Sequence, residues 1–181
     1  MNITVFCGST AGKEEAYTKA AEDLGRWIAE NGHALLYGGA KTGLMGTVSD
    51  TVLSLGGRVT GVLPDVAEIQ ARRHPGLTAY VNTKDMAERK DYMIRHADVY
   101  VALPGGPGTL DELTDILCLK RLGLNKKPLV LFSVSGYYDT LESFFSKMQK
   151  SEFSLSSDFE NVLVSGDLAE IARFLETHQV S

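Results

Sequence analysis

Short runs of β-branched and aromatic residues alternate with longer amphipathic segments along nearly the whole chain. The short runs predict strands at Ile3–Phe6, Ala34–Tyr37, Arg58–Leu63, Ala79–Val81, Val99–Leu103, Leu129–Phe132 and Val162–Val164. Apolar residues spaced three and four apart predict helices at Glu14–Glu30, Leu44–Leu55, Met86–His96, Leu110–Leu122, Tyr138–Gln149 and Leu168–Thr177. The less regular stretch from Pro64 to Gly76 predicts a loop or a short helix.

This alternation of strands and helices predicts right-handed βαβ crossovers and one parallel sheet. The run Val99–Leu103 is apolar without interruption, as expected for a central strand covered on both faces. We therefore expect an α/β fold, a doubly wound parallel sheet with helices on both faces. A length of 181 residues suits one domain, so residues 1–181 are expected to form a single unit.

The composition limits the classes of partner. Lys and Arg number 18 against 23 Asp and Glu, and a net charge of −5 argues against binding along a nucleic-acid backbone. The chain has no apolar run of membrane-spanning length and no signal peptide at its start, so we expect a cytoplasmic protein without a membrane partner.

The cysteines and histidines show no metal-ligand spacing, so no metal site is expected. Cys7 and Cys118 form no Cys-x-x-Cys pair, and both are expected to be buried thiols in a reducing compartment.

Three predicted strands run directly into turns rich in glycine and small residues. These turns lie at Phe6–Ser9, Tyr37–Gly46 and Leu103–Thr109. The carboxyl ends of parallel strands share one edge of the sheet, where doubly wound folds bind ligands. We therefore expect the turns to converge on one crevice, with Ser9 and Gly39 contributing to ligand binding.

The turn Gly105–Thr109 carries the sharpest signal for an anion site. Glycines let a ligand approach the main chain, and the following helix offers free N–H groups and the positive end of its dipole. The alternative is a tight turn with a helix cap. The sequence is not a Walker P-loop, nor a full dinucleotide fingerprint, because Asp111 stands where the third glycine should be.

Charged residues near this turn have both a structural and a functional interpretation. Glu112 follows Thr109 at capping-box spacing, but a carboxylate beside a phosphate could instead stabilise a ribosyl oxocarbenium-like transition state. Arg89 and Lys90 belong to a run that is typical of a solvated helix face. Alternatively, they face the crevice and neutralise an anionic ligand.

The order and spacing of these motifs resemble the Lonely Guy (LOG) family. The stretch Pro104–Glu112 is similar to the family signature Pro-Gly-Gly-x-Gly-Thr-x-x-Glu, and Met86-x-x-Arg89-Lys90 to its second motif. A third match runs from Gly38 to Gly46, and Gly136–Tyr138 is similar to a further shared turn. The resemblance covers almost the whole chain.

The resemblance implies a Rossmann-like fold and hydrolysis of the N-glycosidic bond of nucleoside 5′-monophosphates. The expected substrates are cytokinin riboside monophosphate, AMP or both, and the products are a free base and ribose 5-phosphate. No cofactor is implied. Members have often been labelled lysine decarboxylases, but no lysine here has a recognisable pyridoxal-phosphate context. A non-catalytic nucleotide or cofactor carrier on the same fold, similar to molybdenum-cofactor carriers, is the alternative.

By this resemblance Glu112 and Arg89 form the catalytic pair, and Lys90 contacts the substrate. The phosphate binders are Gly105, Gly106, Gly108 and Thr109. This sequence departs from the family at two positions. Ala40 replaces the third glycine of a Gly-Gly-Gly stretch, and Ala71 stands where many bacterial members have a glutamate.

The resemblance also implies a homodimer. The helix expected at Leu110–Leu122 carries more apolar residues than one core-facing stripe needs. These residues are Leu113, Ile116, Leu117, Leu119 and Leu122. We therefore expect the surplus to help form a two-fold interface near the active site.

Overall fold

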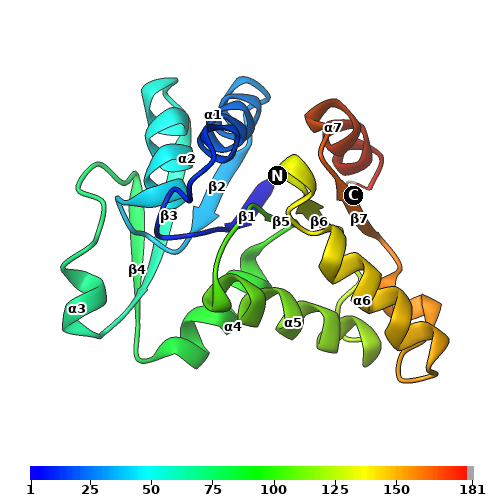
Figure 1. Cartoon of the computed structure of the whole chain (residues 1–181). Coiled ribbons are helices and arrows are strands. Elements are labelled where there is room, and N and C mark those ends of the chain that lie inside the picture. The colour runs from blue at the N-terminus through cyan, green and yellow to red at the C-terminus, as the bar shows by residue number, and fades with distance from the viewer. Residues whose placement is uncertain (179–181) are drawn as a thin grey trace.

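All strands lie in one parallel sheet in the order β4-β3-β2-β1-β5-β6-β7 (Figure 1). The computed structural model describes residues 1–178, so the last three positions of the predicted domain, 179–181, lie outside the described residues. The strands are β1 (Asn2–Phe6), β2 (Ala34–Tyr37), β3 (Arg58–Pro64), β4 (Ala79–Thr83), β5 (Val99–Ala102), β6 (Leu129–Phe132) and β7 (Val162–Ser165). The predicted α/β class and parallel sheet are confirmed.

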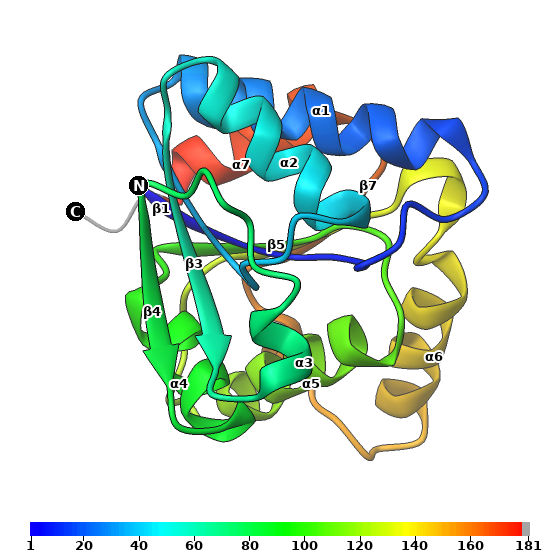
Figure 2. The ribbon, with the colours of Figure 1, turned by 90° about the vertical axis from the view of Figure 1, so that its left-hand side faces the viewer.

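Helices cover both faces of the sheet, as Figures 1 and 2 show from two directions. On one face lie α1 (Glu15–Glu30), α2 (Gly43–Ser54) and α7 (Leu168–Thr177). On the other lie α4 (Met86–His96), α5 (Pro107–Arg121) and α6 (Asp139–Lys150). The chain reverses direction across the sheet at β1, because β2 and β5 flank that strand. This reversal creates the crevice at which doubly wound folds bind ligands.

The two faces of the sheet support separate apolar cores. Ile3 and Val5 of β1 pack with α1 and α2, while Phe6 of the same strand packs with residues of α4 and α5. Successive side chains of a strand point to opposite faces. A central strand covered on both sides must therefore be apolar throughout, which explains its unbroken hydrophobic sequence.

The irregular stretch from Pro64 to Gly76 contains a short helix, α3 (Ala67–Gln70), which confirms one of the two predicted forms. Short 3-10 turns at Val134–Gly136 and Ser156–Phe159 were not predicted. No helix in the described part of the chain has both the length and the apolar character needed to cross a membrane.

Two predictions about α5 are wrong. The helix begins at Pro107 rather than at Leu110, because proline suits the first helical position, where its missing N–H costs no hydrogen bond. Cys118 is exposed rather than buried, since it shares the outward face of α5 with Asp111, Thr114 and Arg121. Cys7 is buried as predicted.

Candidate active site

A cavity of about 320 Å³ lies at the carboxyl edge of the central strands. Its volume falls within the range of small-molecule sites, about 300–1,000 Å³. Its walls include residues from the turns after β1, β2 and β5, together with residues of α4 and of the segment around α3. The lining includes Cys7, Ser9, Gly38, Arg72, Arg89, Thr109 and Glu112.

Most of the predicted site residues meet in this cavity. Ser9, Gly106, Gly108, Thr109, Arg89 and Glu112 line it. Gly105 lines an adjoining cavity of about 230 Å³, which also contacts Gly106. Gly39 and Lys90 line neither cavity.

Gly39 shapes the turn after β2 rather than the cavity wall. Its φ of 81° lies in the left-handed region, and a Cβ there would come within 2.5 Å of the Leu63 side chain. Its carbonyl accepts a hydrogen bond from the N–H of His74 at 2.9 Å. The position therefore needs glycine for backbone reasons.

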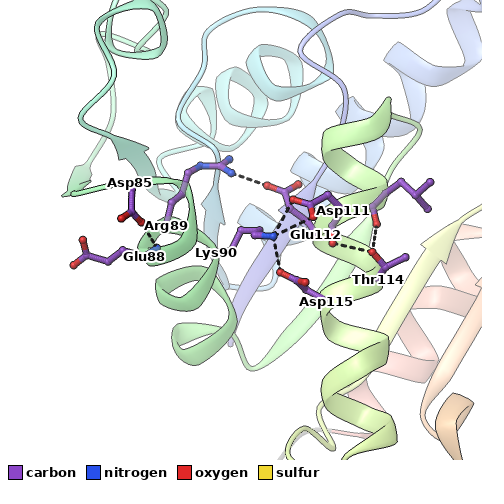
Figure 3. Close-up of polar contacts among 9 residues, drawn as sticks. Asp85, Glu88, Arg89, Lys90, Asp111, Glu112, Thr114 and Asp115 are labelled. Carbon is purple, nitrogen blue, oxygen red and sulfur yellow. Dashed lines mark hydrogen bonds and ion pairs between the residues drawn. The ribbon is translucent and has the colours of Figure 1, made fainter.

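Arg89 and Glu112 form a buried ion pair across the cavity wall (Figure 3). Nη1 of Arg89 donates to Oε1 of Glu112 at 2.7 Å, and Nε of Arg89 donates to the Val62 carbonyl at 3.0 Å. The two residues are only 6% and 7% exposed. Because burying such charges is costly unless they are paired, the fold has to hold both side chains in one arrangement.

Local structure around α4 orients the Arg89 side chain. At the start of α4, Oδ1 of Asp85 accepts from the N–H of Glu88, which fixes the helix so that Arg89 faces inward. A Cβ at Gly38 would collide with the Arg89 guanidinium, so this glycine makes room for it. The interpretation of residues 86–90 as a solvated face is therefore wrong for Arg89.

The capping interpretation of Glu112 is also wrong. The N-cap of α5 is Gly106, and no side-chain hydrogen bond caps the helix. Glu112 therefore lies in the second turn of the helix, where its carboxylate has no orphan N–H group to satisfy. Its side chain instead accepts a hydrogen bond from Arg89 and lines the cavity.

Burial raises the pKa of the Glu112 carboxyl above its ordinary value, although the Arg89 guanidinium opposes that shift. Cys7 also lines the cavity, but burial raises the pKa of its thiol, and the nearby Glu112 charge adds to the effect. Cys7 is therefore a neutral thiol and a poor nucleophile.

Lys90 is held away from the cavity by two carboxylates of α5. Its Nζ lies 2.9 Å from Oδ2 of Asp111 and 2.7 Å from Oδ2 of Asp115 (Figure 3). These ion pairs raise the pKa of the Lys90 ammonium group. The structure thus gives Lys90 a role in joining α4 to α5, outside the group of residues that line the cavity.

The turn before α5 is anchored to the turn after β1. The N–H of Gly8 donates to the Pro104 carbonyl at 3.0 Å. The first backbone bond of the helix runs from the N–H of Leu110 to the Gly106 carbonyl, so the N–H groups of Gly108 and Thr109 precede it and have no partner within the helix. Thr109 is buried in the cavity wall beside them. This arrangement suits an anion.

Two tyrosines that were assigned no function from the sequence support the same turn. The hydroxyl of Tyr137 donates to the Gly105 carbonyl at 2.5 Å, and that of Tyr138 donates to the Leu103 carbonyl at 2.7 Å. Fixing these carbonyls also fixes the peptide groups that follow them. The signals in the sequence are the similarity of Gly136–Tyr138 to a turn shared by the LOG family and its position just after β6, whose carboxyl end lies at the same edge.

Comparison with known proteins assigns the chain to a family. A family model described as "Possible lysine decarboxylase" matches residues 45–175. The cytokinin riboside 5′-monophosphate phosphoribohydrolase LOG5 of Arabidopsis thaliana is 37% identical over 177 residues, which cover 98% of this chain and 78% of LOG5. The phosphoribohydrolase of the same description from Rhodococcoides fascians is 39% identical over 168 residues, covering 92% of this chain and 85% of that protein.

The chain belongs to the LOG family.

Solved structures place this LOG family member among proteins of the same fold. The Moco Carrier Protein from Chlamydomonas reinhardtii is 26% identical, with a TM-score of 0.72 over 97% of this chain and 98% of that one. The molybdenum cofactor binding protein from Rippkaea orientalis has a TM-score of 0.75 at 22% identity, over 97% of this chain and 95% of that one, and so supports the fold alone.

Proposed function

We propose that this LOG family member hydrolyses the N-glycosidic bond of nucleoside 5′-monophosphates. Cytokinin riboside monophosphate and AMP are the proposed substrates, and a free base and ribose 5-phosphate the products. The observation that carries the proposal is the buried Arg89–Glu112 pair in the wall of a cavity that also contains the start of α5. Relatives described as cytokinin riboside 5′-monophosphate phosphoribohydrolases support it over most of the chain.

The phosphate binds at the start of α5. The free N–H groups of Gly108 and Thr109, the Thr109 hydroxyl and the positive end of the helix dipole all favour a dianion there. Glu112 follows Thr109 by three residues, or about 4.5 Å along the helix axis. A phosphate at the helix start and a C1′ atom beside Glu112 can therefore belong to one ribose. The anchored phosphate holds the reacting carbon in place.

Glu112 stabilises the positive charge that develops on C1′ as the bond to the base breaks. The electron pair of that bond leaves with the base. Water then supplies hydroxyl to C1′ and a proton to the released base. Arg89 holds the Glu112 carboxylate in place through their hydrogen bond.

The residues present do not fit the decarboxylase description. Such an enzyme needs a lysine to bind pyridoxal phosphate as a Schiff base. Among the described residues no lysine lines the cavity, and Lys90 is occupied by Asp111 and Asp115. No step of the proposed reaction therefore uses that cofactor.

A carrier without catalytic activity is the second candidate, favoured by the structural match to the Chlamydomonas Moco carrier. A phosphate binder has no need of a buried carboxylate in the same cavity, because that charge weakens anion binding. Incubation with AMP and with isopentenyladenosine monophosphate distinguishes the two. We expect release of free base, whereas intact bound nucleotide would favour the carrier.

The rate of the reaction should depend on pH through Glu112. Because burial raises its pKa, this carboxyl takes up a proton at a higher pH than an ordinary glutamate, for which the pKa is about 4.3. The proposed chemistry needs the ionised form, so kcat/KM should fall as the pH is lowered through that raised pKa. A pH profile with AMP measures the midpoint of this acid limb. A midpoint at or below the ordinary glutamate value would contradict the prediction.

We also propose a homodimer. The predicted apolar surplus on α5 is smaller than expected, because Leu113 and Ile116 are fully buried in the core. Leu110, Leu122 and Leu124 nevertheless remain exposed, by 44%, 69% and 73%. Light scattering at micromolar concentration should give a dimer mass, and Leu122→Asp should shift it toward the monomer. A monomer mass for the wild-type protein would contradict the proposal.

The cytoplasmic location remains a prediction of the sequence.

A further inference from the structure

One charged residue in the cavity wall has no part in the proposed reaction. Arg72 lies two residues after the end of α3, is exposed, and lines the same cavity as Glu112. Arg89 and Glu112 neutralise each other, and Asp111 is paired with Lys90. Within residues 1–178 no ion pair or side-chain hydrogen bond engages the Arg72 guanidinium. The cavity therefore offers a ligand one uncompensated cation.

Backbone contacts fix where the main chain of Arg72 lies. The Arg72 carbonyl accepts from the N–H of Lys41 at 3.0 Å, and the N–H of His74 donates to the Gly39 carbonyl at 2.9 Å. The segment is thus attached to the turn after β2. Strand β1 separates β2 from β5, and two strand spacings amount to about 10 Å. Arg72 therefore approaches the cavity from the side opposite the phosphate-binding turn.

The wall on this side has the character of a base-binding site. Met45, Ile69 and Met86 line the same cavity as Arg72. Three flexible or branched apolar side chains can pack on the flat face of a base, and one guanidinium can reach its edge. No carboxylate of the preceding helix adds to this wall, because position 71 is Ala and Glu68 does not line the cavity.

The chemistry of the guanidinium selects among bases. It donates hydrogen bonds and accepts none, and its two parallel N–H groups match two adjacent acceptors. A 6-oxopurine offers such a pair in O6 and N7, whereas adenine presents an amino group in place of O6. We propose that Arg72 is a specificity-determining residue that extends the substrates to 6-oxopurine nucleoside 5′-monophosphates. This inference rests on the proposed hydrolysis of nucleoside monophosphates.

The neighbouring residue provides a matched control. The guanidinium of Arg73 lies over the exposed ring of Tyr80, 4.5 Å from its centroid, and Arg73 is not among the residues that line the cavity. Arg72→Met and Arg73→Met therefore remove the same charge from adjacent positions. Only the first removes it from the cavity.

The test compares IMP with AMP, which differ at position 6 of the base. We expect the wild-type protein to hydrolyse IMP with a kcat/KM about tenfold to a hundredfold above that for AMP, the range of one two-pronged arginine contact. Arg72→Met should lose this preference through a fall in the IMP value, with the AMP value within about threefold of wild type. Arg73→Met should retain the wild-type ratio.

Two results would overturn the inference. An equal fall for IMP and AMP in Arg72→Met would assign the arginine to the phosphate or to the shape of the loop. A wild-type preference for AMP would exclude a 6-oxopurine contact while leaving the proposed hydrolysis intact. If neither nucleotide releases base, the proposed hydrolysis fails. Titration calorimetry with both nucleotides then tests the role of Arg72 in binding. A wild-type preference for IMP that is lost in Arg72→Met supports the inference. Equal affinities for IMP and AMP in the wild type reject it.

Discussion

Replacing Glu112 with Gln is expected to lower the turnover of AMP by at least about a hundredfold, the scale of one preorganised electrostatic contact in a catalytic site. Glutamine keeps the size of the side chain and an oxygen that can accept from Arg89, but it lacks the negative charge proposed to stabilise C1′. Nucleotide affinity should persist or increase, because a carboxylate near the bound phosphate has gone. Release of free adenine and nucleotide affinity are the two measurements.

Asp115→Asn is the matched control for this variant. Asp115 also lies on α5 and also pairs with a cation of α4, but it does not line the cavity. Its replacement removes a similar charge at a partly exposed position, where such pairs contribute little to stability. We expect normal hydrolysis from Asp115→Asn. Normal hydrolysis from Glu112→Gln as well would return Glu112 to a structural role and favour the carrier.

Removing the 5′-phosphate from the substrate should have an effect of similar size. Adenosine cannot use the N–H groups at the start of α5, and charge-assisted hydrogen bonds are worth about 1.5–3 kcal/mol each. The loss of two such bonds corresponds to a fall in kcat/KM of at least about a hundredfold. Part of this decrease in kcat/KM should appear as a lower kcat, because a loosely held ribose no longer places C1′ beside Glu112.

Adenosine 3′-monophosphate distinguishes the effect of the position of the phosphate on the ribose from the effect of its charge. It carries the same phosphate on the same nucleoside, but it cannot place C1′ at Glu112 while the phosphate occupies the turn. We expect it to behave as adenosine does or to inhibit. Comparable kcat/KM values for adenosine and AMP would show that the turn at Gly105–Thr109 does not bind the phosphate during the reaction.

The sequence predicts the fold of this chain well because its strong signals are local. Alternation of apolar runs with amphipathic segments is enough to place every strand and every long helix to within a few residues. The boundary that it misses, the start of α5, had a consequence for function. Taking Leu110 as the first helical residue made Glu112 look like a capping residue, whereas the true start at Pro107 places it in the second turn.

The sequence identifies which charged residues belong to the site more readily than it predicts how they are arranged. Glu112 and Arg89 were both candidates, but Arg89 and Lys90 are adjacent in sequence, and only the rotation of α4 decides which one faces the cavity. That rotation depends on the cap at Asp85 and on the space left by Gly38. The sequence does not identify Arg72 as a candidate, because its place depends on backbone contacts between the segment after α3 and the turn after β2, and no local pattern predicts such contacts.

The Arg89–Glu112 pair joins residues only 23 positions apart in the chain. One helix–strand–helix segment, α4-β5-α5, thus carries both residues of the proposed catalytic pair and the proposed phosphate-binding turn. Of the residues proposed to contact the base, Ile69 and Arg72 come from a different segment, around α3, whereas Met45 belongs to α2 and Met86 to α4. The proposed specificity-determining residue, Arg72, therefore lies outside the stretch of sequence that carries the proposed reaction. Exchanging the residues around α3 between relatives is therefore a way to change which nucleotide is accepted. The residues of α4-β5-α5 proposed to break the glycosidic bond would stay unchanged.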